Sequence, residues 1–294
     1  MRILLFGCDG QLGGELQSSL ASLGEVIAVN KEDLDLTKVD IIPTFIDKVH
    51  PEFIVNAAAY TNVDQAEIEL DVAYTVNAIT PGVMAESARR SGSLFIHYST
   101  DYVFDGQKGK PYTEGDSPNP INAYGHSKLA GEQAVQAVGG SFLILRTSCL
   151  YGLMGSSFPC KVLAWAREQK VMRIVEDQVG SPTWCRVLAE CTAALLSREY
   201  RSRSGWPAER SGLYHVAGKG SASRFEWAKR ILELDPHPEE QLVEEIQPAR
   251  TEEFPTPAKR PENSALDCSR FEDTFDLLLP DWDSSLAIAM AEGS

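Results

Sequence analysis

The stretch Ile3-Leu-Leu-Phe-Gly-Cys-Asp-Gly-Gln-Leu-Gly13 decides the fold. Its apolar start, Ile3 to Phe6, predicts a buried strand, and the amphipathic segment from Leu12 to Leu23 predicts a helix directly after the turn. The glycines of the turn lack a Cβ, so backbone amides can approach a phosphate there, and the helix start adds partial positive charge. We therefore interpret the turn as a dinucleotide-binding loop. The alternative is a tight turn whose glycines serve only helix packing.

Strand-like and helix-like segments alternate through the first half of the chain. Short apolar runs of this kind are typical of strands buried on both faces of a parallel sheet. Their alternation with helical segments predicts an α/β fold, a doubly wound parallel sheet of the Rossmann-like type. The further strands are expected at 26–29, 53–56, 94–98 and 142–145, and the further helices at 39–49, 73–91 and 123–138.

The pattern becomes less regular after about Leu150. We expect residues 1–150 to form a dinucleotide-binding domain and residues 151–294 a smaller C-terminal α/β domain that is mainly substrate-binding. This second domain should be discontinuous, with some segments returning to the first. Its expected elements are a helix at 158–169, a strand at 171–175, a helix at 187–198, an exposed connection at 201–212, and an irregular, proline-rich surface segment at 247–261.

Composition excludes several classes of protein. The formal charge of −15 arises from acidic residues scattered along all 294 positions, which argues against general nucleic-acid binding. The six cysteines form no Cys-x-x-Cys pair, so we interpret them as reduced, mostly buried thiols and expect no zinc site. No apolar run approaches the length of about 18 residues that a membrane span needs, and no leader precedes Ile3. We expect a cytoplasmic protein without a membrane partner.

The glycine spacing and the end of the second strand bear on the cofactor. G-x-x-G-x-x-G spacing indicates the short-chain reductase superfamily. Asn30 and Lys31 stand where an acidic residue would bind the adenosine ribose and repel a 2′-phosphate. We therefore expect NADPH to be preferred and NADH to be usable, although Glu32 and Asp33 follow the cation and Lys31 can equally be a solvated side chain.

Tyr124 and Lys128 are the candidate catalytic pair. A separation of four places both side chains on one helix face, one turn apart. A phenol titrates near 10, and a nearby cation favours its ionised form, so we expect Lys128 to lower the pKa of Tyr124. Tyr124 would then donate a proton to a carbonyl oxygen while a hydride reaches the carbon, and Lys128 would also contact the nicotinamide ribose. An exposed helix pair is the alternative.

The end of the fourth strand gives this pair its context. Thr100 lies at the carboxyl edge of the expected sheet, where open α/β folds bind ligands, and its hydroxyl can hold the same carbonyl oxygen. A helix cap is the other reading of Thr100. Asp101 either orients substrate hydroxyls or braces the loop, with equal weight. His97 and His126 have no clear partner in the sequence and are set aside.

Blocks of residues along nearly the whole chain resemble one family, that of the dTDP-4-dehydrorhamnose reductases, which are extended short-chain dehydrogenases/reductases. The blocks at 177–183 and 255–261 distinguish this family from general sugar-nucleotide epimerases. The matching blocks are Leu4-Leu-Phe-Gly7 with Gly10-Gln-Leu-Gly13, Val55-Asn-Ala-Ala-Ala59, His97-Tyr-Ser-Thr-Asp-Tyr-Val-Phe104, Tyr124-Gly-His-Ser-Lys-Leu-Ala-Gly-Glu132, Asp177-Gln-Val-Gly-Ser-Pro-Thr183 and Pro255-Thr-Pro-Ala-Lys-Arg-Pro261.

The resemblance implies reduction of the C4 ketone of dTDP-6-deoxy-L-lyxo-4-hexulose to dTDP-L-rhamnose, a step in the synthesis of surface polysaccharide such as lipopolysaccharide O-antigen. It implies a catalytic triad of Thr100, Tyr124 and Lys128, and substrate contacts from Thr100, Asp101 and position 149. The implied cofactor positions are Gly10, Gln11, Leu12, Asn30, Asp35, Leu36, Ala59, Tyr60, Thr61, Tyr124 and Lys128. The glycine loop and the end of the second strand add Gly7, Gly13 and Lys31 as candidate cofactor residues.

The chain departs from the family pattern at two positions. Cys149 stands where family members commonly carry Trp, which removes an apolar wall beside the sugar and leaves the exact deoxyhexulose open. Asn30 replaces a frequent Asp, which favours NADPH. Some relatives bind magnesium at a subunit contact; Glu15 matches one such position, but Arg186 stands where a second carboxylate is expected, so the sequence leaves magnesium undecided and we predict no metal ligand.

Three functions remain open on the sequence, and each allows a homodimer. The first is the reductase. The second is another sugar-nucleotide reductase or an epimerase, which keeps its cofactor bound and recycles the hydride. The third is a non-enzymatic nucleotide-binding protein, similar to the regulatory subunit of methionine adenosyltransferase.

Overall fold

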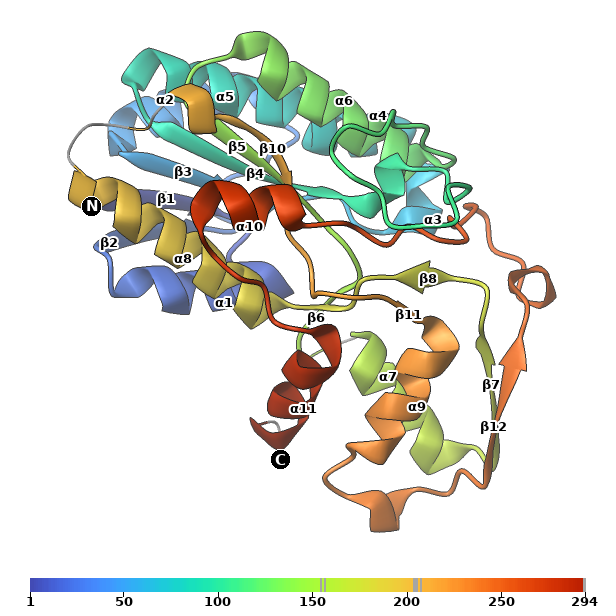
Figure 1. Cartoon of the computed structure of the whole chain (residues 1–294). Coiled ribbons are helices and arrows are strands. Elements are labelled where there is room, and N and C mark those ends of the chain that lie inside the picture. The colour runs from blue at the N-terminus through green and yellow to red at the C-terminus, as the bar shows by residue number, and fades with distance from the viewer. Residues whose placement is uncertain (154, 156, 203–205, 207, 293–294) are drawn as a thin grey trace.

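A parallel sheet organises the first part of the molecule (Figure 1). The computed structural model describes residues 1–153, 155, 157–202, 206 and 208–292. Within them, six strands pair in the order β10-β5-β4-β3-β1-β2, and all neighbours run parallel. This confirms the doubly wound α/β fold. The strands are β1 (Arg2–Phe6), β2 (Glu25–Val29), β3 (Phe53–Asn56), β4 (Leu94–Thr100), β5 (Phe142–Thr147) and β10 (Gly212–His215).

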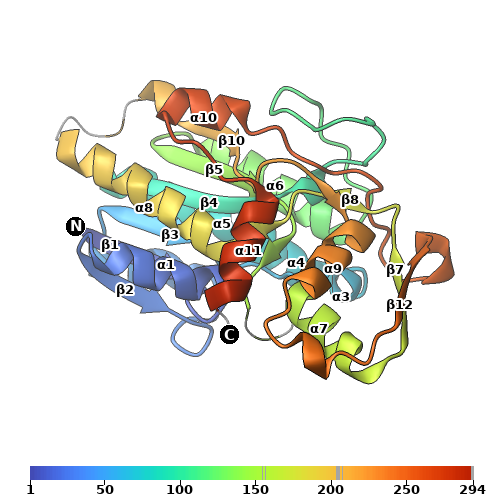
Figure 2. The same cartoon turned by 60° about the horizontal axis from the view of Figure 1, so that its bottom comes forward.

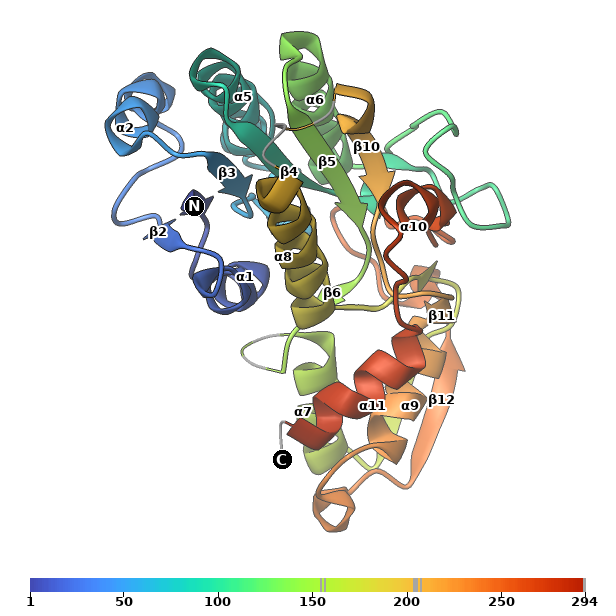
Figure 3. The ribbon, with the colours of Figure 1, turned by 60° about the vertical axis from the view of Figure 1, so that its left-hand side comes forward.

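Helices cover both faces of the sheet, as Figure 3 shows from the side. Side chains alternate along each strand, so Ile3 and Leu5 of β1 join one core while Leu4 and Phe6 join the other. One layer contains α1 (Gln11–Ala21), α8 (Cys185–Ser202) and α10 (Ser269–Phe275); the other contains α2 (Ile42–Val49), α5 (Thr80–Ser91) and α6 (Ala123–Val138).

A smaller lobe lies beside the carboxyl edge of the sheet, at the lower right of Figure 2. Its core gathers around Trp227 and Tyr151, which meet edge to face with ring centroids 5.4 Å apart. The lobe contains α7 (Phe158–Glu168), β7 (Val171–Val175), α9 (Arg224–Glu233), β12 (Glu245–Ala249) and α11 (Trp282–Glu292), with the short strands β6 (Leu150–Tyr151), β8 (Val179–Gly180), β9 (Thr183–Trp184) and β11 (Ala222–Ser223).

Some elements from the second half of the chain return to the sheet and to the helices that cover it. The chain leaves the sheet after β5 and returns for β10, which pairs with β5 through Leu213 and Ile144. Helices α8 and α10 also lie against the sheet. We infer that α8, β10 and α10 belong to the first domain and that the helices and strands of the smaller lobe form the second.

Two expectations about local structure were wrong. Residues 247–249 are not irregular, because they complete β12, which pairs in parallel with β7. Pro248 is compatible with this strand since the two-stranded ribbon leaves one edge of β12 free of a partner within the described chain. The exposed connection at 201–212 is also shorter than expected: α8 continues to Ser202 and β10 begins at Gly212, while 203–205 and 207 lie outside the described residues.

The helix expected at 73–91 is interrupted. Helix α4 (Leu70–Tyr74) passes into a π-helical turn, η2 (Thr75–Ile79), before α5 begins. Helix α6 packs tightly on this turn, because a Cβ at Gly131 would lie 2.1 Å from the carbonyl oxygen of Asn77. Asn77 in turn binds the backbone of Tyr60 through both atoms of its amide group. The irregular turn therefore positions the loop after β3, as π-helical turns often do near functional sites.

No helix in the described ranges combines the length and apolar character that crossing a membrane requires.

Candidate active site

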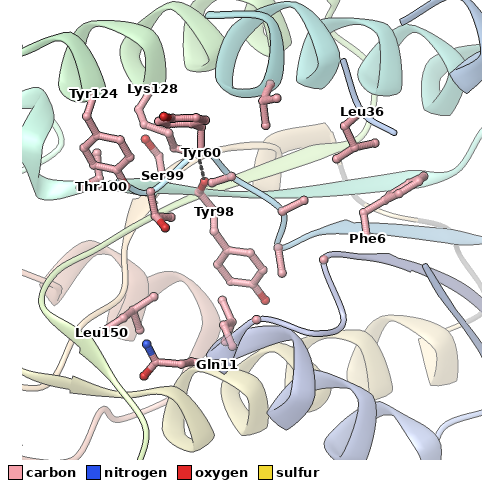
Figure 4. A pocket seen from close by; sticks show the side chains of 18 of the residues that line it. Phe6, Gln11, Leu36, Tyr60, Tyr98, Ser99, Thr100, Tyr124, Lys128 and Leu150 are labelled. Atoms are coloured by element: carbon pink, nitrogen blue, oxygen red, sulfur yellow. Dashed lines mark hydrogen bonds between the residues drawn. The ribbon is translucent and has the colours of Figure 1, made fainter. Parts of the chain in front are cut away.

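A cleft of about 950 Å³ opens at the carboxyl ends of the strands, between the sheet and the smaller lobe. Its walls come from the residues that follow β1, β2, β3, β4 and β5. Figure 4 shows Thr100, Tyr124 and Lys128 together at one side, with Phe6 and Leu36 at the far end. The structure brings to this cleft the predicted residues Gly7, Gly10, Gln11, Leu12, Asn30, Lys31, Asp35, Leu36, Ala59, Tyr60, Thr61, Thr100, Asp101, Tyr124, Lys128 and Cys149.

Gly13 is the predicted residue that does not line the cleft. A Cβ at Gly13 would lie 1.9 Å from the carbonyl oxygen of Gly7, so this glycine lets α1 pack against the turn. Gly7 itself has a φ of +80°, and a Cβ there would lie 2.6 Å from the amide nitrogen of Ala58. Both glycines are therefore required by the backbone, which is the packing role given as the alternative for this loop.

The start of α1 suits a pyrophosphate. Gly10 is the residue before the helix, and no side chain caps the free amides of the first turn. That turn also contains no acidic residue, so it keeps its partial positive charge for a ligand. The next residue, Gln11, accepts a hydrogen bond of 2.8 Å from the amide of Gly152, which connects the loop to the smaller lobe.

Local hydrogen bonds occupy the side chains of Asn30 and Asp35, at the end of the cleft that follows β2. The Asn30 side-chain oxygen accepts from the amides of Glu32 and Asp33, at 2.8 and 3.0 Å. Asp35 accepts from the amide and hydroxyl of Thr37, and these bonds hold the pKa of its carboxyl below the usual value. Lys31 is exposed and lines the cleft. Lys31 is therefore a cation at this end of the cleft, and its charge helps to hold the pKa values of Asp35 and Glu69 below their usual values.

Tyr124 enters the cleft from the first turn of α6. The Asn122 side chain caps this helix by accepting a hydrogen bond from the Gly125 amide. Burial raises the pKa of the Tyr124 phenol well above its usual value, and a hydrogen bond with Thr100 acts in the opposite direction. Our expectation of a lowered pKa was therefore wrong: a phenol in this position is protonated at neutral pH and can donate its proton.

Thr100 has the capping role considered for it, and its hydroxyl also lies beside Tyr124. Its hydroxyl oxygen accepts the Tyr102 amide at 3.2 Å and so caps a 3-10 turn, η3 (Asp101–Val103). It also donates to Asp101 at 3.2 Å and contacts the Tyr124 phenol. Because Thr100 ends β4, which is two residues longer than expected, its position is fixed by the sheet.

Lys128 lies one turn further along α6 and is 1% exposed. Its ammonium group donates to the carbonyl oxygen of Tyr98 at 2.6 Å, and His97 Nε2 lies 3.4 Å away. Burial lowers the pKa of Lys128 to about 8, while the Glu132 carboxylate opposes this change. The lysine therefore titrates much closer to neutral pH than an exposed lysine does.

Asp101 lines the cleft and connects three segments of the chain. Its carboxylate accepts from the hydroxyls of Thr100, Ser148 and Ser264, the Ser148 bond being 2.9 Å long. Burial raises the pKa of this carboxyl, and the hydroxyl bonds lower it. These contacts favour the bracing role over direct orientation of substrate hydroxyls.

Cys149 and Arg224 both line the cleft and lie close enough to interact electrostatically. Cys149 has a φ of 46°. Its sulfur packs so closely against Gly180 that a Cβ at position 180 would lie 2.6 Å from the sulfur, so only glycine fits there. Arg224, the first residue of α9, lines the cleft and hydrogen-bonds Tyr102. Its guanidinium stacks over Phe158 at 4.8 Å and forms no ion pair within the described residues.

The sequence did not single out Arg224, because a lone arginine at a helix start has no distinguishing signal. It also set aside His97, which has no clear partner in the sequence; in the structure this histidine is packed, fully buried, between Asn56 and Lys128. His126 is exposed.

Glu15 forms an ion pair of 3.2 Å with Arg186, which also binds Glu292. Across the described residues, no group of three or more His, Cys, Asp or Glu side chains is arranged to hold a metal ion. All six cysteines are free, but Cys185 alone is fully buried, so the expectation of mostly buried thiols was wrong.

Comparison with known proteins gives a consistent result over the whole chain. A family model described as the RmlD substrate binding domain matches residues 1–294. A dTDP-4-dehydrorhamnose reductase of Burkholderia thailandensis is 40% identical over 295 residues, covering 99% of both chains. A crystal structure of a dTDP-4-dehydrorhamnose reductase from Clostridium acetobutylicum aligns with a TM-score of 0.90 and 36% identity over 99% of each chain. The Bacillus anthracis dTDP-4-dehydrorhamnose reductase, solved in complex with NADP, aligns with a TM-score of 0.89 and 34% identity, again over 99% of each.

Proposed function

This chain belongs to the RmlD substrate-binding-domain family, and we propose that it is an NADPH-dependent oxidoreductase that reduces the C4 ketone of dTDP-4-dehydro-L-rhamnose to dTDP-L-rhamnose. One observation carries the proposal. Thr100, Tyr124 and Lys128 meet in the same cleft as an uncapped, glycine-lined helix start, so a proton donor and a dinucleotide site lie together.

The cofactor supplies a hydride to the carbonyl carbon. Thr100 and Tyr124 hold the ketone oxygen from two sides, and the Tyr124 phenol transfers its proton to that oxygen as negative charge develops on it. Lys128, one turn from Tyr124 on α6, would hold the nicotinamide ribose and return a proton toward Tyr124. Gly7, Gly10 and the first amides of α1 bind the pyrophosphate, while Ala59, Tyr60 and Thr61 contact the cofactor from the loop after β3.

An NADPH oxidation assay tests this function directly. The 4-keto sugar is generated in situ by the preceding enzymes of the dTDP-sugar pathway, and loss of absorbance at the nicotinamide band is followed together with formation of dTDP-L-rhamnose. We expect stoichiometric NADPH loss and rhamnose formation. Cofactor that copurifies and is not consumed would instead indicate an epimerase, and binding of NADPH without turnover would indicate a nucleotide-binding regulatory protein.

Lys31 is proposed to determine the preference for NADPH. Replacing Lys31→Glu puts a negative charge where the 2′-phosphate binds, so the ratio of kcat/KM for NADPH to that for NADH should fall about tenfold or more, equivalent to at least about 1.4 kcal/mol. Steady-state kinetics with both cofactors measure the ratio. Lys38→Glu is the matched control, since Lys38 is exposed but does not line the cleft. An equal ratio in both variants would refute the role of Lys31.

Arg224 is proposed to bind the diphosphate of the sugar nucleotide. A cation that faces the cleft without an ion-pair partner among the described residues, in a chain of net charge −15, is suited to a phosphate group. Arg224→Gln should raise KM for the nucleotide sugar by about 10- to 100-fold, because a charge-assisted hydrogen bond contributes about 1.5–3 kcal/mol. The KM for NADPH should not change.

Lys229→Gln on the same helix is the control for the Arg224 prediction, because Lys229 is exposed and does not line the cleft. A similar rise of KM in both variants would show that charge on α9 matters only through the overall field.

A further inference from the structure

A buried series of hydrogen-bonding groups connects the loop after β3 to the side-chain nitrogen of Lys128. It begins at the amide of Ala58, passes through the side chain of Asn56 at the end of β3, and continues to His97 in β4. The separations are 3.2 Å from the Ala58 nitrogen to Asn56 Oδ1, 3.2 Å from Asn56 Nδ2 to His97 Nδ1, and 3.4 Å from His97 Nε2 to Lys128 Nζ. Asn56 and His97 are 1% and 0% exposed, so water does not replace these partners.

The direction of each hydrogen bond in this series follows from its first member. The Ala58 amide can only donate, so the Asn56 oxygen must face it and the Asn56 NH2 group must face His97. Nδ1 of His97 must then accept, which leaves the ring proton on Nε2. Turning the carboxamide around would place two donors against each other and leave the Ala58 amide without an acceptor.

We propose that Asn56 fixes His97 as the Nε2–H tautomer, so that His97 presents an N–H donor to Lys128 and favours the neutral amine of this lysine. A neutral amine can accept from His97 while donating to the Tyr98 carbonyl. An ammonium group has three N–H donors and no acceptor, so it opposes the His97 N–H. The low pKa of Lys128 agrees with this arrangement.

The other charged and titratable groups around Lys128 act differently. Glu132, one turn along α6, favours the ammonium form, but both of its oxygens are bound by Arg146 of β5. Burial keeps Tyr124 protonated and therefore neutral, and burial together with the charge of Lys128 lowers the pKa of His97 well below its usual value. His97 therefore acts on Lys128 as a fixed dipole and not as a second charge.

Asn56 and His97 are positioning residues in this scheme. Their consequence for turnover rests on the proposed function: a lysine that is partly neutral near the working pH can take up a proton and pass it toward Tyr124. The tautomer itself and the proton affinity of Lys128 do not depend on that function.

The test begins with nuclear magnetic resonance of protein labelled with nitrogen-15 histidine. The chain has five histidines, and His97→Phe assigns the signal. We expect the wild-type His97 to show an unprotonated Nδ1 and a protonated Nε2. The opposite tautomer, or a mixture of both, would overturn the proposal whether or not the protein has enzymatic activity.

Asn56→Asp is the variant that reverses the tautomer. A carboxylate of nearly the same shape accepts from both the Ala58 amide and His97 Nδ1–H, so Nε2 becomes an acceptor for the Lys128 ammonium. The midpoint of the Lys128 titration, read from its carbon-13 Cε signal and assigned with Lys128→Met, should rise by about one pH unit or more. The limb of the kcat pH profile that belongs to Lys128 should move in the same direction and by the same amount.

His97→Phe provides a second variant that does not bury a new charge. It keeps a ring next to Phe95 but removes the N–H that faces Lys128, so the lysine midpoint should again rise. The control is Ser93→Ala, which removes a buried hydroxyl bonded to the Pro51 carbonyl near the opposite end of the same strands. Unchanged titration midpoints of Lys128 in both Asn56→Asp and His97→Phe would overturn the link between His97 and Lys128. A wild-type protein that shows the expected His97 tautomer but no turnover would count only against the proposed reductase function.

Discussion

Replacing Tyr124 with phenylalanine is expected to lower kcat about 10²- to 10⁴-fold, the range typical of a lost general acid. The ring and its edge-to-face contact with Tyr102 are retained, with centroids 5.9 Å apart in the present structure, so the cleft should keep its shape. The dissociation constant for NADPH should therefore change little. Single-turnover kinetics and fluorescence titration measure the two quantities separately.

Tyr151→Phe is the matched control for this result. Tyr151 is a fully buried tyrosine in the smaller lobe, and its hydroxyl has no hydrogen-bonding partner among the described residues. The same atom is removed from the same kind of ring, away from the ketone site. Equal kcat values for Tyr124→Phe and the wild type would remove Tyr124 from its proposed role, and equal losses in both tyrosine variants would indicate a general packing effect.

The second large effect is expected on the free energy of unfolding, when the buried ion pair between Glu132 and Arg146 is broken. Glu132 and Arg146 form a buried ion pair, with side chains 2% and 3% exposed, through bonds of 2.8 and 2.6 Å. Glu132 also accepts from Ser99 at 2.5 Å, so the pair joins α6 to both β4 and β5. Removing one member leaves an uncompensated buried charge. Glu132→Ala should therefore reduce the free energy of unfolding by about 3–5 kcal/mol.

Urea denaturation followed by circular dichroism measures this change. Glu86→Ala is the control, because Glu86 pairs with Arg89 on the exposed surface of α5, and its loss should cost at most about 1 kcal/mol. The double replacement Glu132→Leu with Arg146→Met removes both charges and should recover much of the lost stability. Similar costs for Glu132→Ala and Glu86→Ala would contradict the importance of burial for this pair.

Much of the fold was predictable because its decisive signals are local. The buried strands β1, β3, β4 and β5 each correspond to an apolar run, and the glycine turn lies between a strand and a helix. Strand β10 was not predicted. Gly212–His215 is a short segment whose strand conformation depends on pairing with β5, far away in sequence. The same reason explains β12, which acquires its conformation from β7.

The candidate site also has one part that the sequence could predict and one part that it could not. Tyr124 and Lys128 could be paired from their spacing, since helix geometry fixes their relative position. Their electrostatics could not be predicted, because burial dominates the pKa of both groups and burial is a property of the assembled sheet. His97 and Arg224 could not be placed for the same reason: each gains its partners only when segments distant in sequence come together.

The late return of β10 to the sheet has a consequence for the order in which the protein is made. Until the ribosome has synthesised Gly212–His215, the side of β5 that pairs with β10 exposes unpaired backbone groups. At roughly 5–20 residues per second, the segment between the two strands takes several seconds to emerge. A nascent chain that already contains the complete glycine loop therefore passes through a stage in which β5, an interior strand of the finished sheet, forms an open edge. We expect chaperone demand and aggregation during expression to be greatest in this interval.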